Sequence, residues 1–386
     1  MPPLVVTLRR TPFNRTSIAA LLAVLEQELP DGLVEPRLAT SKEQVEPSTG
    51  LVVLSLMSAQ LTPTLAEIRW LRERRGAGLA IVAGGPHPAT DPTGMLAAGV
   101  DWVAVGEAGS SFVELVRAIR RGERPPRGIL GPDASQDLDR YPPWPRSGAL
   151  FATLEISRGC PGRCAYCQVP VLHGHRMRHR SVAGLEPVFR QAVATGHSFT
   201  RFVSPNAFAY GSADGRMANP RALERLLRAA RQSGLERVFL GSFPSEVRPE
   251  TVTDETLALV RDLCANRGVV VGLQSGSDAL LRRVGRGHSV EQGVEAVRRI
   301  ARAGLRPLVD FIFGLPGETE RDRRLSVELI RRLSDEHGAR INTHLFMPLA
   351  GTPLAGAPPG TVDAATRELL RELVGRGACW AFERAC

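Results

Sequence analysis

Three cysteines within eight residues are the most chemically informative feature of this sequence. Cys160, Cys164 and Cys167 have the spacing C-x3-C-x2-C, and the aromatic residue Tyr166 precedes the third cysteine. A [4Fe–4S] cluster is normally held by four cysteine thiolates. Three thiolates would leave one iron of such a cluster open to another ligand. The triplet therefore predicts a cluster that can bind a small molecule directly.

A structural zinc site is the alternative for the same cysteines. Such a site usually takes four ligands, often as two separated pairs. Here the triplet is compact, and the nearest further ligands are His173, His175 and His179. These histidines fit better as a polar loop that leads to Ser181, a residue placed to cap the next helix. The cluster is the favoured interpretation.

The remaining cysteines are too few for a second cubane or for a disulfide scaffold. They are Cys264, Cys379 and Cys386. A reducing cytoplasm is therefore the expected location. The sequence shows no run of 18 apolar residues and no signal-peptide pattern at its start, so no membrane segment is expected.

The net charge of +9 comes almost entirely from arginine, since Lys42 is the only lysine among 49 basic residues. The arginines are spread along helices, often beside glutamate. This pattern favours a solvated arginine-rich surface over a nucleic-acid patch, and an RNA substrate is the less favoured alternative. A length of 386 residues, with 43% hydrophobic and 23% charged residues, is typical of a soluble two-domain protein.

The elements that must position the cysteines follow an α/β pattern. Residues 1–121 alternate short apolar runs with amphipathic helices, which predicts a doubly wound, Rossmann-like parallel sheet. Residues 122–147 are rich in proline and are interpreted as a linker. The strands expected in the first domain are Leu4–Leu8, Leu51–Ser55, Leu79–Ala83 and Trp102–Val105.

Residues 148–354 resume the alternation as six strand–helix units, which predicts a partial (β/α)6 barrel. The cysteine loop follows the first strand and so lies at the carboxyl-end mouth of the barrel. Residues 355–386 are expected to be a helical extension, with an amphipathic segment at Ala364–Val374. The six barrel strands are expected at Phe151–Ser157, Phe199–Ser204, Arg237–Leu240, Val269–Leu273, Leu308–Phe313 and Ile341–Phe346.

The segment Ile156-Ser-Arg-Gly-Cys160-Pro-Gly-Arg-Cys164-Ala-Tyr-Cys167 resembles the signature of the radical S-adenosylmethionine (SAM) enzymes. The resemblance implies that SAM binds the open iron and is cleaved to a 5′-deoxyadenosyl radical. It also implies that further strand ends hold SAM. The expected cofactor-binding residues of the barrel are Tyr166, Ser204, Asn206, Glu246, Arg248, Gln274, Ser275, Arg286, Phe311, Gly314 and Met347.

The resemblance implies different roles for these residues. Ser204 and Asn206 stand where the family usually has a Gly-Gly-Glu motif for the methionine amino group. Glu246, Arg248 and Arg286 are candidates for the carboxylate or for a substrate group. The segment around Gln274 and Ser275 resembles the ribose-binding segment of relatives of the methylthiotransferases. Phe311, Gly314 and Met347 lie in segments expected to flank adenine, and Asp310 stands where the family often has glycine.

The first domain resembles the cobalamin-binding domain that precedes many radical SAM barrels. Its resemblance rests on three loops that follow predicted strands, and it implies that these loops surround the corrin. The Asp-x-His-x-x-Gly motif that supplies a cobalt ligand is missing, as it is in many barrel-linked domains of this kind. The cofactor-binding residues expected from it are Ser58, Gly84, Gly85, His87, Gly106 and Glu107.

The resemblance predicts a cobalamin-dependent enzyme that methylates an unactivated carbon or phosphorus. The alternatives are a radical rearrangement, a cyclisation or an RNA modification without cobalamin, and a non-enzymatic iron–sulfur carrier or sensor. RNA methylthiolation is disfavoured because residues 1–121 contain no cysteine for an extra cluster and no basic β-barrel follows residue 354. The expected partners are a reductant such as ferredoxin or flavodoxin and an unidentified small molecule or peptide substrate, with no membrane.

Overall fold

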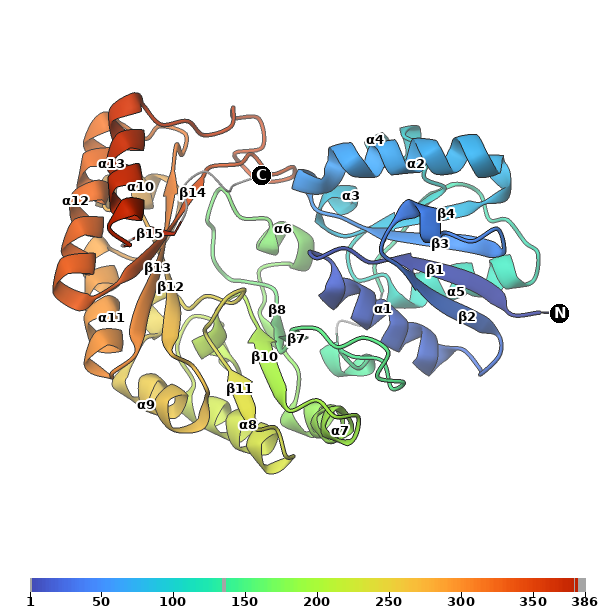
Figure 1. Ribbon diagram of the computed structural model, residues 1–386, viewed down its shortest axis with the longest axis horizontal. Helices are drawn as coiled ribbons and strands as arrows, with labels where there is room; N and C mark the ends of the chain where they lie inside the picture. Colours follow the sequence, from blue (N-terminus) through green and yellow to red (C-terminus); the bar gives the residue numbers. More distant parts are fainter. Residues whose placement is uncertain (1, 134–136, 378, 381–386) are drawn as a thin grey trace. The chain divides into compact units, whose positions relative to one another are not determined.

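The computed structural model describes residues 2–133, 137–377 and 379–380. The chain divides into two compact units, Met1–Leu154 and Glu155–Cys386. In the described part of the chain, no helix has the length and apolar character needed to cross a membrane. Each unit is an α/β structure (Figure 1).

The first unit is built on a six-stranded, fully parallel sheet in the order β2-β1-β3-β4-β5-β6. This order confirms the predicted doubly wound fold. The sequence prediction missed two strands, β2 and β6. Both lie at the edges of the sheet, where a strand buries less apolar surface and its sequence pattern is weaker. The strands are β1 (Leu4–Arg9), β2 (Val34–Ala39), β3 (Thr49–Ser55), β4 (Ala80–Gly84), β5 (Trp102–Ala104) and β6 (Gly128–Leu130).

Helices cover both faces of this sheet, with α2 on one face and α1 and α5 on the other (Figure 1). The side chains of Ile68 and Leu71 in α2 are fully buried against residues of β3 and β4. Burying such side chains from water is the main favourable term in folding. The helices are α1 (Arg15–Glu28), α2 (Leu61–Arg75), α3 (Pro86–Thr90), α4 (Pro92–Ala97) and α5 (Gly109–Arg120).

The proline-rich segment 122–147 is part of the first unit rather than a linker outside it. Its strand β6 pairs with β5. Trp102 Nε1 donates to the Pro126 carbonyl oxygen at 3.0 Å, and Gln27 Nε2 donates to the Arg140 carbonyl oxygen at 2.8 Å. The prolines stop helices here, but the segment is tied to the sheet and to α1. The division between the units therefore falls later, after Leu154.

The second unit is an incomplete barrel of parallel strands with helices outside it (Figure 1). Two sheets, β11-β10-β7 and β12-β13-β14-β15, meet through an isolated parallel bridge between Val247 and Val271. This arrangement confirms the predicted partial barrel, and short β15 extends it. The strands are β7 (Leu154–Glu155), β10 (Phe199–Val203), β11 (Arg237–Phe239), β12 (Gly268–Gln274), β13 (Arg306–Phe313), β14 (Arg340–Leu345) and β15 (Cys379–Trp380).

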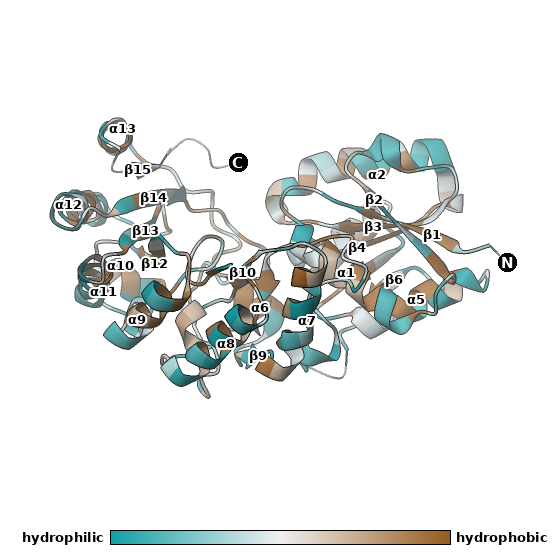
Figure 2. Ribbon diagram, turned by 60° about the horizontal axis from the view of Figure 1, so that its bottom comes forward, coloured by the Kyte–Doolittle hydropathy of each residue, from teal (hydrophilic) through white to brown (hydrophobic). Residues whose placement is uncertain are grey.

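The helices of the second unit are amphipathic and turn their apolar faces to the strands (Figure 2). In α8, for example, Leu223, Leu226 and Leu227 are fully buried. Short α10 was not predicted, because its six residues are too few to show a helical period. The helices are α6 (Val169–His173), α7 (Val182–Ala194), α8 (Pro220–Gln232), α9 (Asp254–Leu263), α10 (Asp278–Arg283), α11 (Val290–Arg302), α12 (Glu320–His337) and α13 (Ala364–Gly375).

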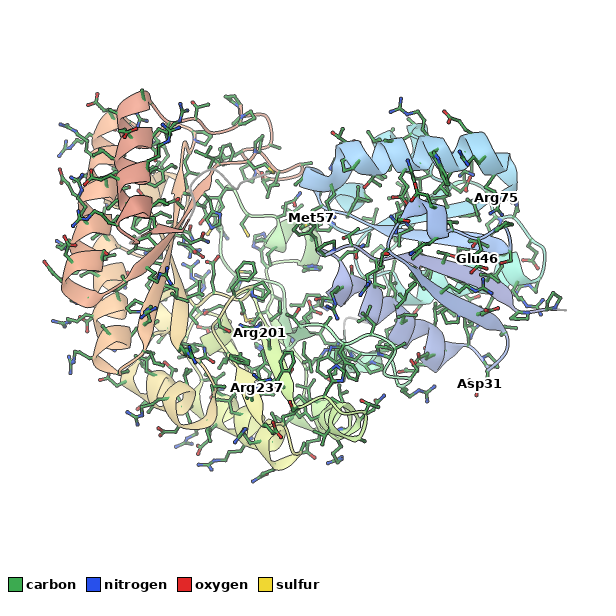
Figure 3. All side chains as sticks on the ribbon, viewed as in Figure 1. Asp31, Glu46, Met57, Arg75, Arg201 and Arg237 are labelled. Carbon is green, nitrogen blue, oxygen red and sulfur yellow. The ribbon has the colours of Figure 1, made fainter. Side chains whose placement is uncertain are left out.

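Several arginines of this unit lie at its surface, as expected for the arginine-rich composition. Arg201 of β10 lies over the ring of Phe239, and Arg237 of β11 lies over the ring of Phe199. Both arginines are labelled in Figure 3. On α8, Arg228 pairs with Glu224 one helical turn away, at 2.8 Å. Arginine stems and guanidinium planes can cover apolar surface in this way while the charge stays in water.

Candidate active site

The cysteine loop lies between two short strands, β8 (Ser157–Arg158) and β9 (Arg178–His179), which pair antiparallel at its base. Inside the loop, the Cys160 amide donates to the Gly174 carbonyl at 3.1 Å and the Cys167 amide donates to the Cys164 carbonyl at 3.1 Å. Gly159 has a φ of 83°, and a Cβ there would collide with the Arg176 carbonyl. The loop conformation is thus fixed by the protein's own backbone.

The loop is also attached to the opposite side of the barrel mouth. The Ala165 amide donates to the Val284 carbonyl at 2.9 Å, and Gln168 Nε2 donates to the Ala350 carbonyl at 2.8 Å. These bonds connect the loop to the segments that follow α10 and β14. The cysteines therefore face the carboxyl ends of several strands at once.

A cavity of about 430 Å3 opens where the loop meets those strand ends. Its volume is within the usual range for a small-molecule site. All three cysteines line it, and so do Tyr166 and five of the other predicted residues. Those five are Ser204, Glu246, Arg248, Gln274 and Arg286.

Two arginines place positive charge beside the middle cysteine of the triplet. Arg286 Nη1 lies 3.6 Å from Cys164 Sγ, and Arg248 Nη1 lies 3.9 Å from the same sulfur. Burial acts to raise the pKa of the Cys164 thiol, but the charges and hydrogen bonds of the two guanidiniums outweigh it, so the pKa lies below its ordinary value. A lowered pKa favours the thiolate, which is the form that binds metal.

Cys167 has the opposite environment. Burial raises the pKa of its thiol to about 11. Burial also raises the pKa of Tyr166, whose hydroxyl has no hydrogen-bond partner in the described part of the chain. The site therefore holds one activated thiol and one that needs a bound metal to ionise at neutral pH.

No group of three or more His, Cys, Asp or Glu side chains among the described residues could hold a single metal ion. A cubane differs in this respect, because each of its cysteines binds a separate iron. The thiols nonetheless share one environment. Gly162 lies against both Cys160 Sγ and Cys164 Sγ, and Cys167 interacts electrostatically with both. The residues present fit a cluster that bridges the three positions.

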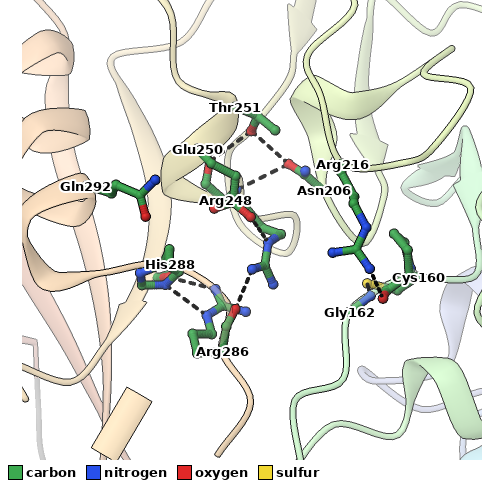
Figure 4. Close-up of polar contacts among 12 residues, drawn as sticks. Cys160, Gly162, Asn206, Arg216, Arg248, Glu250, Thr251, Arg286, His288 and Gln292 are labelled. Atoms are coloured by element: carbon green, nitrogen blue, oxygen red, sulfur yellow. Dashed lines mark hydrogen bonds and ion pairs between the residues drawn. The ribbon is translucent and has the colours of Figure 1, made fainter. Parts of the chain in front are cut away.

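Figure 4 shows the polar contacts that hold Asn206 and Arg248. Asn206 Oδ1 accepts hydrogen bonds from the Arg248 amide at 3.2 Å and from Thr251 Oγ1 at 3.1 Å. Arg248 pairs with Glu250 at 2.5 Å, and it also donates to the Arg286 carbonyl. Fully buried Asn206 therefore supports Arg248 and does not line the cavity, so its oxygen is not offered to an ammonium group.

The other predicted residues outside the cavity lining lie close to it in the chain. Ser275 is buried and faces Ser326 of α12 at 3.4 Å, and Phe311 is fully buried. Gly314 has a φ of 72°, and a Cβ there would press on Gly360. Met347 follows β14 and is half-buried. Their predicted contacts with ribose or adenine remain predictions.

A buried carboxyl pair was not predicted. Glu246 lines the cavity and shares a hydrogen bond with Asp310 of β13, which is only 6% exposed. Burial raises the pKa of Asp310 well above its usual range, and the charge and hydrogen bond of Glu246 raise it further. The raised pKa of Asp310 favours its protonated form, and a protonated Asp310 can donate a hydrogen bond to Glu246.

Neighbouring side chains extend this pair. Gln274 Nε2 donates to Glu246 Oε2 at 3.3 Å, and Asn342 Nδ2 donates to Asp310 Oδ1 at 3.1 Å. The Asn342 amide also lies 2.8 Å from His344 Nε2, which makes that nitrogen an acceptor. Partial desolvation in the cavity lowers the pKa of His344, which favours its neutral form. His344 lines the cavity, although nothing in its sequence context marked it.

In the first unit, the predicted loops lie at the carboxyl ends of β3, β4 and β5. Ser58 Oγ lies 3.1 Å from His87 Nδ1, and buried His87 Nε2 has no hydrogen-bond partner in the described part of the chain. Gly85 has a φ of 96°, and a Cβ there would press on Leu56. Gly84 ends β4, and Gly106 and Glu107 follow β5, where the Asp133 amide donates to the Glu107 carbonyl at 2.6 Å.

Cys264 and Cys379, the two further cysteines in the described part of the chain, do not line the cavity. Cys264 lies at the carboxyl end of α9 as its C-cap residue, and burial raises the pKa of its thiol to about 12. Cys379 begins β15 and is buried. Cys386 lies outside the described residues.

A parallel partial barrel with a cysteine triplet at its mouth defines the class of iron–sulfur barrel enzymes. The chain belongs to the Radical SAM superfamily, whose sequence model matches residues 154–355, more than half of its length. That family membership confirms the [4Fe–4S] cluster and SAM as the cofactors.

The chain is also similar to curated proteins. It is 32% identical over 248 residues to tRNA-2-methylthio-N(6)-dimethylallyladenosine synthase from Geobacter sulfurreducens, covering 63% of this chain and 53% of the relative. It is 29% identical over 313 residues to the enzyme of the same name from Mycobacterium bovis, covering 78% of this chain and 59% of that one. The chain thus spans a little more than half the length of these relatives.

Solved structures share the fold of both units. The radical SAM methyltransferase TsrM from Kitasatospora setae, with cobalamin and a [4Fe–4S] cluster bound, superposes with a TM-score of 0.69 at 20% identity, over 92% of this chain and 77% of that one. The cobalamin-dependent SAM radical enzyme OxsB superposes with a TM-score of 0.65 at 14% identity, over 97% of this chain and 55% of that one. These similarities confirm the predicted fold of both units.

Proposed function

We propose that this protein is a cobalamin-dependent radical SAM methyltransferase that acts on an unactivated carbon or phosphorus. The observation that carries the proposal is that one chain holds two sites. The second unit holds the cysteine triplet, and the first unit holds a buried histidine with an unused ring nitrogen among the loops at its sheet edge. TsrM and OxsB, whose fold this chain shares, are both named as cobalamin-containing enzymes.

In the barrel, Cys160, Cys164 and Cys167 would hold the [4Fe–4S] cluster. When bound, the cluster supplies an electron to cleave SAM and an open iron to position it. Arg286 and Arg248 stabilise the thiolate of Cys164, and their remaining donors suit a carboxylate in the cavity. A reductant such as ferredoxin or flavodoxin would supply the electron, and the substrate would be a small molecule or a peptide.

In the first unit, the loops that follow β3, β4 and β5 suit a large flat ligand. His87 is 8% exposed, and Ser58 holds its Nδ1, so its Nε2 has a fixed direction. Gly85 brings the backbone of its loop against Leu56 without a side chain between them. We assign Ser58, Gly84, Gly85, His87, Gly106 and Glu107 to the cobalamin site on this basis.

Modification of tRNA without cobalamin is the second candidate, because the chain is similar to the tRNA-modifying synthases from Geobacter and Mycobacterium. The two candidates differ in what the first unit must hold. The sequence has no cysteine before Cys160, so the first unit offers no thiolate for a further cluster. This favours the methyltransferase.

The test is anaerobic reconstitution of the full chain with iron and sulfide, with and without cobalamin. S-adenosylhomocysteine and 5′-deoxyadenosine are then measured after dithionite and SAM are added. We expect corrin to be retained on gel filtration and S-adenosylhomocysteine to form only with cobalamin. The His87→Ala variant should lose at least about tenfold in corrin retention, as loss of a polar contact to a ligand often does. Equal product formation with and without cobalamin would contradict the proposal.

A further inference from the structure

Three exposed arginines lie on the cysteine loop and on the segment packed against it. Arg163 lies inside the loop, Arg176 lies near its end, and Arg216 lies in the segment that follows β10. None of the three forms an ion pair in the described part of the chain. Their charges are therefore not neutralised within the chain, although they lie close to the residues that would hold the cluster.

Contacts of the backbone bring these arginines to one surface. Arg216 Nη2 donates to the Pro161 carbonyl oxygen at 3.0 Å, and Figure 4 shows Arg216 beside Cys160. A Cβ on Gly159 would collide with the Arg176 carbonyl, so Arg176 adjoins the start of the same loop. The three arginines therefore form one positively charged surface next to Cys160, called here the arginine face.

The protein is thin behind the arginine face. The Gly162 amide donates to Cys160 Sγ at 3.4 Å, and a Cβ on Gly162 would lie 3.2 Å from that sulfur and 3.9 Å from Cys164 Sγ. Pro161 and Gly162 are half-buried, and the next residue, Arg163, is exposed. A short stretch of backbone thus separates two sulfurs from exposed surface. Electrons tunnel faster across a short gap, so this surface offers an electron donor a close approach to the cluster.

The segment after β10 adds two exposed residues to the arginine face. Met217 is 64% exposed and supplies an apolar, polarisable thioether. The Arg216 and Met217 amides and the Ser212 hydroxyl donate to the exposed Asp214 carboxylate and lower its pKa to about 2, so this carboxylate is ionised at neutral pH. One carboxylate against three guanidiniums leaves the surface positive.

We propose that the arginine face, together with Met217, is the docking site of an acidic flavodoxin that reduces the cluster. This inference rests on the radical SAM function proposed above. A flavodoxin combines an acidic surface with the exposed apolar edge of its flavin, and these complement the guanidiniums and the Met217 thioether. In the step, the flavin hydroquinone anion loses one electron and becomes the neutral semiquinone, and the oxidised cluster gains that electron. No proton moves and no covalent bond changes.

An RNA is the other kind of acidic partner that arginines can bind. Sites for single-stranded nucleic acid combine basic residues with aromatic side chains on which bases stack. The arginine face consists of arginines and carries Met217 and Asp214, with no aromatic side chain among them, and the Asp214 carboxylate would repel a phosphate. These residues therefore favour a protein partner over an RNA.

Binding and reduction are measured separately on the full-length protein with its cluster reconstituted. Oxidised flavodoxin is titrated calorimetrically at low and at high salt to give Kd. Flavodoxin hydroquinone is then mixed with the protein in an anaerobic stopped-flow instrument, and formation of the flavin semiquinone is followed. Dithionite, a small reductant that needs no docking surface, is used in parallel, with cluster absorbance as its readout.

Arg163→Glu and Arg176→Glu should each weaken flavodoxin binding by at least about fivefold at low salt and slow semiquinone formation, because each places a negative charge against an acidic partner. High salt should weaken binding to the wild type and reduce this difference. Met217→Ser should weaken binding by about threefold at either salt concentration, since its contact is apolar. Iron per chain and the rate of reduction by dithionite should stay at wild-type values in all three variants.

Arg306→Glu is the matched control. Arg306 is exposed and has no ion pair in the described part of the chain. It begins β13, so it lies at the amino end of the barrel strands, whereas the cysteine loop lies at their carboxyl ends. This variant makes the same change in net charge and should keep the wild-type Kd for flavodoxin.

Unchanged flavodoxin binding in both Arg163→Glu and Arg176→Glu would overturn the inference, and so would an equal loss in Arg306→Glu, which would report net charge alone. Arginine-dependent binding of a ferredoxin or a tRNA, with no such binding of flavodoxin, would also overturn it. Failure of the proposed methyl transfer has a different signature. In that case no S-adenosylhomocysteine forms with dithionite and cobalamin, while flavodoxin binding and its loss in the arginine variants persist.

Discussion

Arg286 Nη1 lies 3.6 Å from the sulfur of Cys164, although the two residues are far apart in the sequence. The same guanidinium donates to the Gly272 carbonyl at 2.6 Å, so its position is fixed by the barrel strand. The middle cysteine of the triplet is thus held in a positive environment by the protein alone. The effect of this environment on the reactivity of the Cys164 thiol can therefore be measured in the apoprotein.

The apoprotein thiols should react at different pH values. Because the guanidiniums lower the pKa of Cys164 while burial raises the pKa of Cys167 to about 11, Cys164 should be alkylated by iodoacetamide from a lower pH. Arg286→Gln should move the Cys164 profile to higher pH. Mass spectrometry of peptides labelled between pH 6 and 10 measures both. Identical profiles for the two cysteines would contradict this expectation.

Cys164→Ala should remove the cluster. Two thiolates cannot replace three in the loop, so iron per chain after anaerobic reconstitution should fall from about four to below about one. The brown absorbance should fall in parallel. Cys264→Ala is the matched control, because Cys264 lies at the end of α9 and should leave iron content unchanged. Iron content equal to wild type in Cys164→Ala would exclude the assignment.

Gly272→Ala should impair SAM cleavage with little effect on cluster content. The added methyl group would displace Glu246, Arg286 and Gln274 from the point where they converge. A misplacement of about 1 Å near reacting groups can lower a rate by up to about 100-fold, so a fall of at least about tenfold in 5′-deoxyadenosine is expected. In Gly356→Ala the methyl group meets no atom within 4 Å, and this control should retain activity.

Glu318→Gln should change how stability depends on pH. Burial raises the pKa of Glu318 to about 7 in the folded protein, above its ordinary value of 4.5. The folded state therefore binds the proton more tightly, and the contribution of Glu318 to stability falls as pH rises from about 5 to about 8. Glutamine lacks this loss, so the variant should gain roughly 1–3 kcal/mol relative to wild type over that range.

Urea unfolding at pH 5 and at pH 8 measures this change. Glu318 accepts a hydrogen bond from the Gly314 amide at 2.7 Å, a bond that the glutamine oxygen can keep. Glu255→Gln is the control, since Glu255 is an exposed residue in the first turn of α9. A gap between wild type and Glu318→Gln that stays constant with pH would be inconsistent with the raised pKa.

The sequence predicted the parts of the fold that carry a strong local pattern. The fully buried run of β12 and the capped helix that begins after Ser181 are examples. It missed β2 and β6, which lie at sheet edges and bury little. It also treated residues 122–147 as a linker, because proline content reports what a segment cannot form and does not report what it packs against.

In the site, too, residues were predicted where the local sequence was informative, and contacts between residues far apart in the sequence were missed. Glu246 and Arg248 were expected to bind SAM or a substrate group, and both line the cavity. Asn206 was expected to bind SAM but supports Arg248 instead. The pairing of Glu246 with Asp310 depends on the register between β12 and β13. A register shift at Gly272 cannot be derived from one sequence, because it is set by contacts across strands.

The short ribbon of β8 and β9 has a consequence for biogenesis. All three cysteines belong to one loop, and backbone pairing between β8 and β9 closes that loop. Chain segments far apart in sequence need not wait for iron before they come together. The barrel can therefore mature first and accept a preassembled cubane afterwards, so that loading becomes the last event in making the working enzyme.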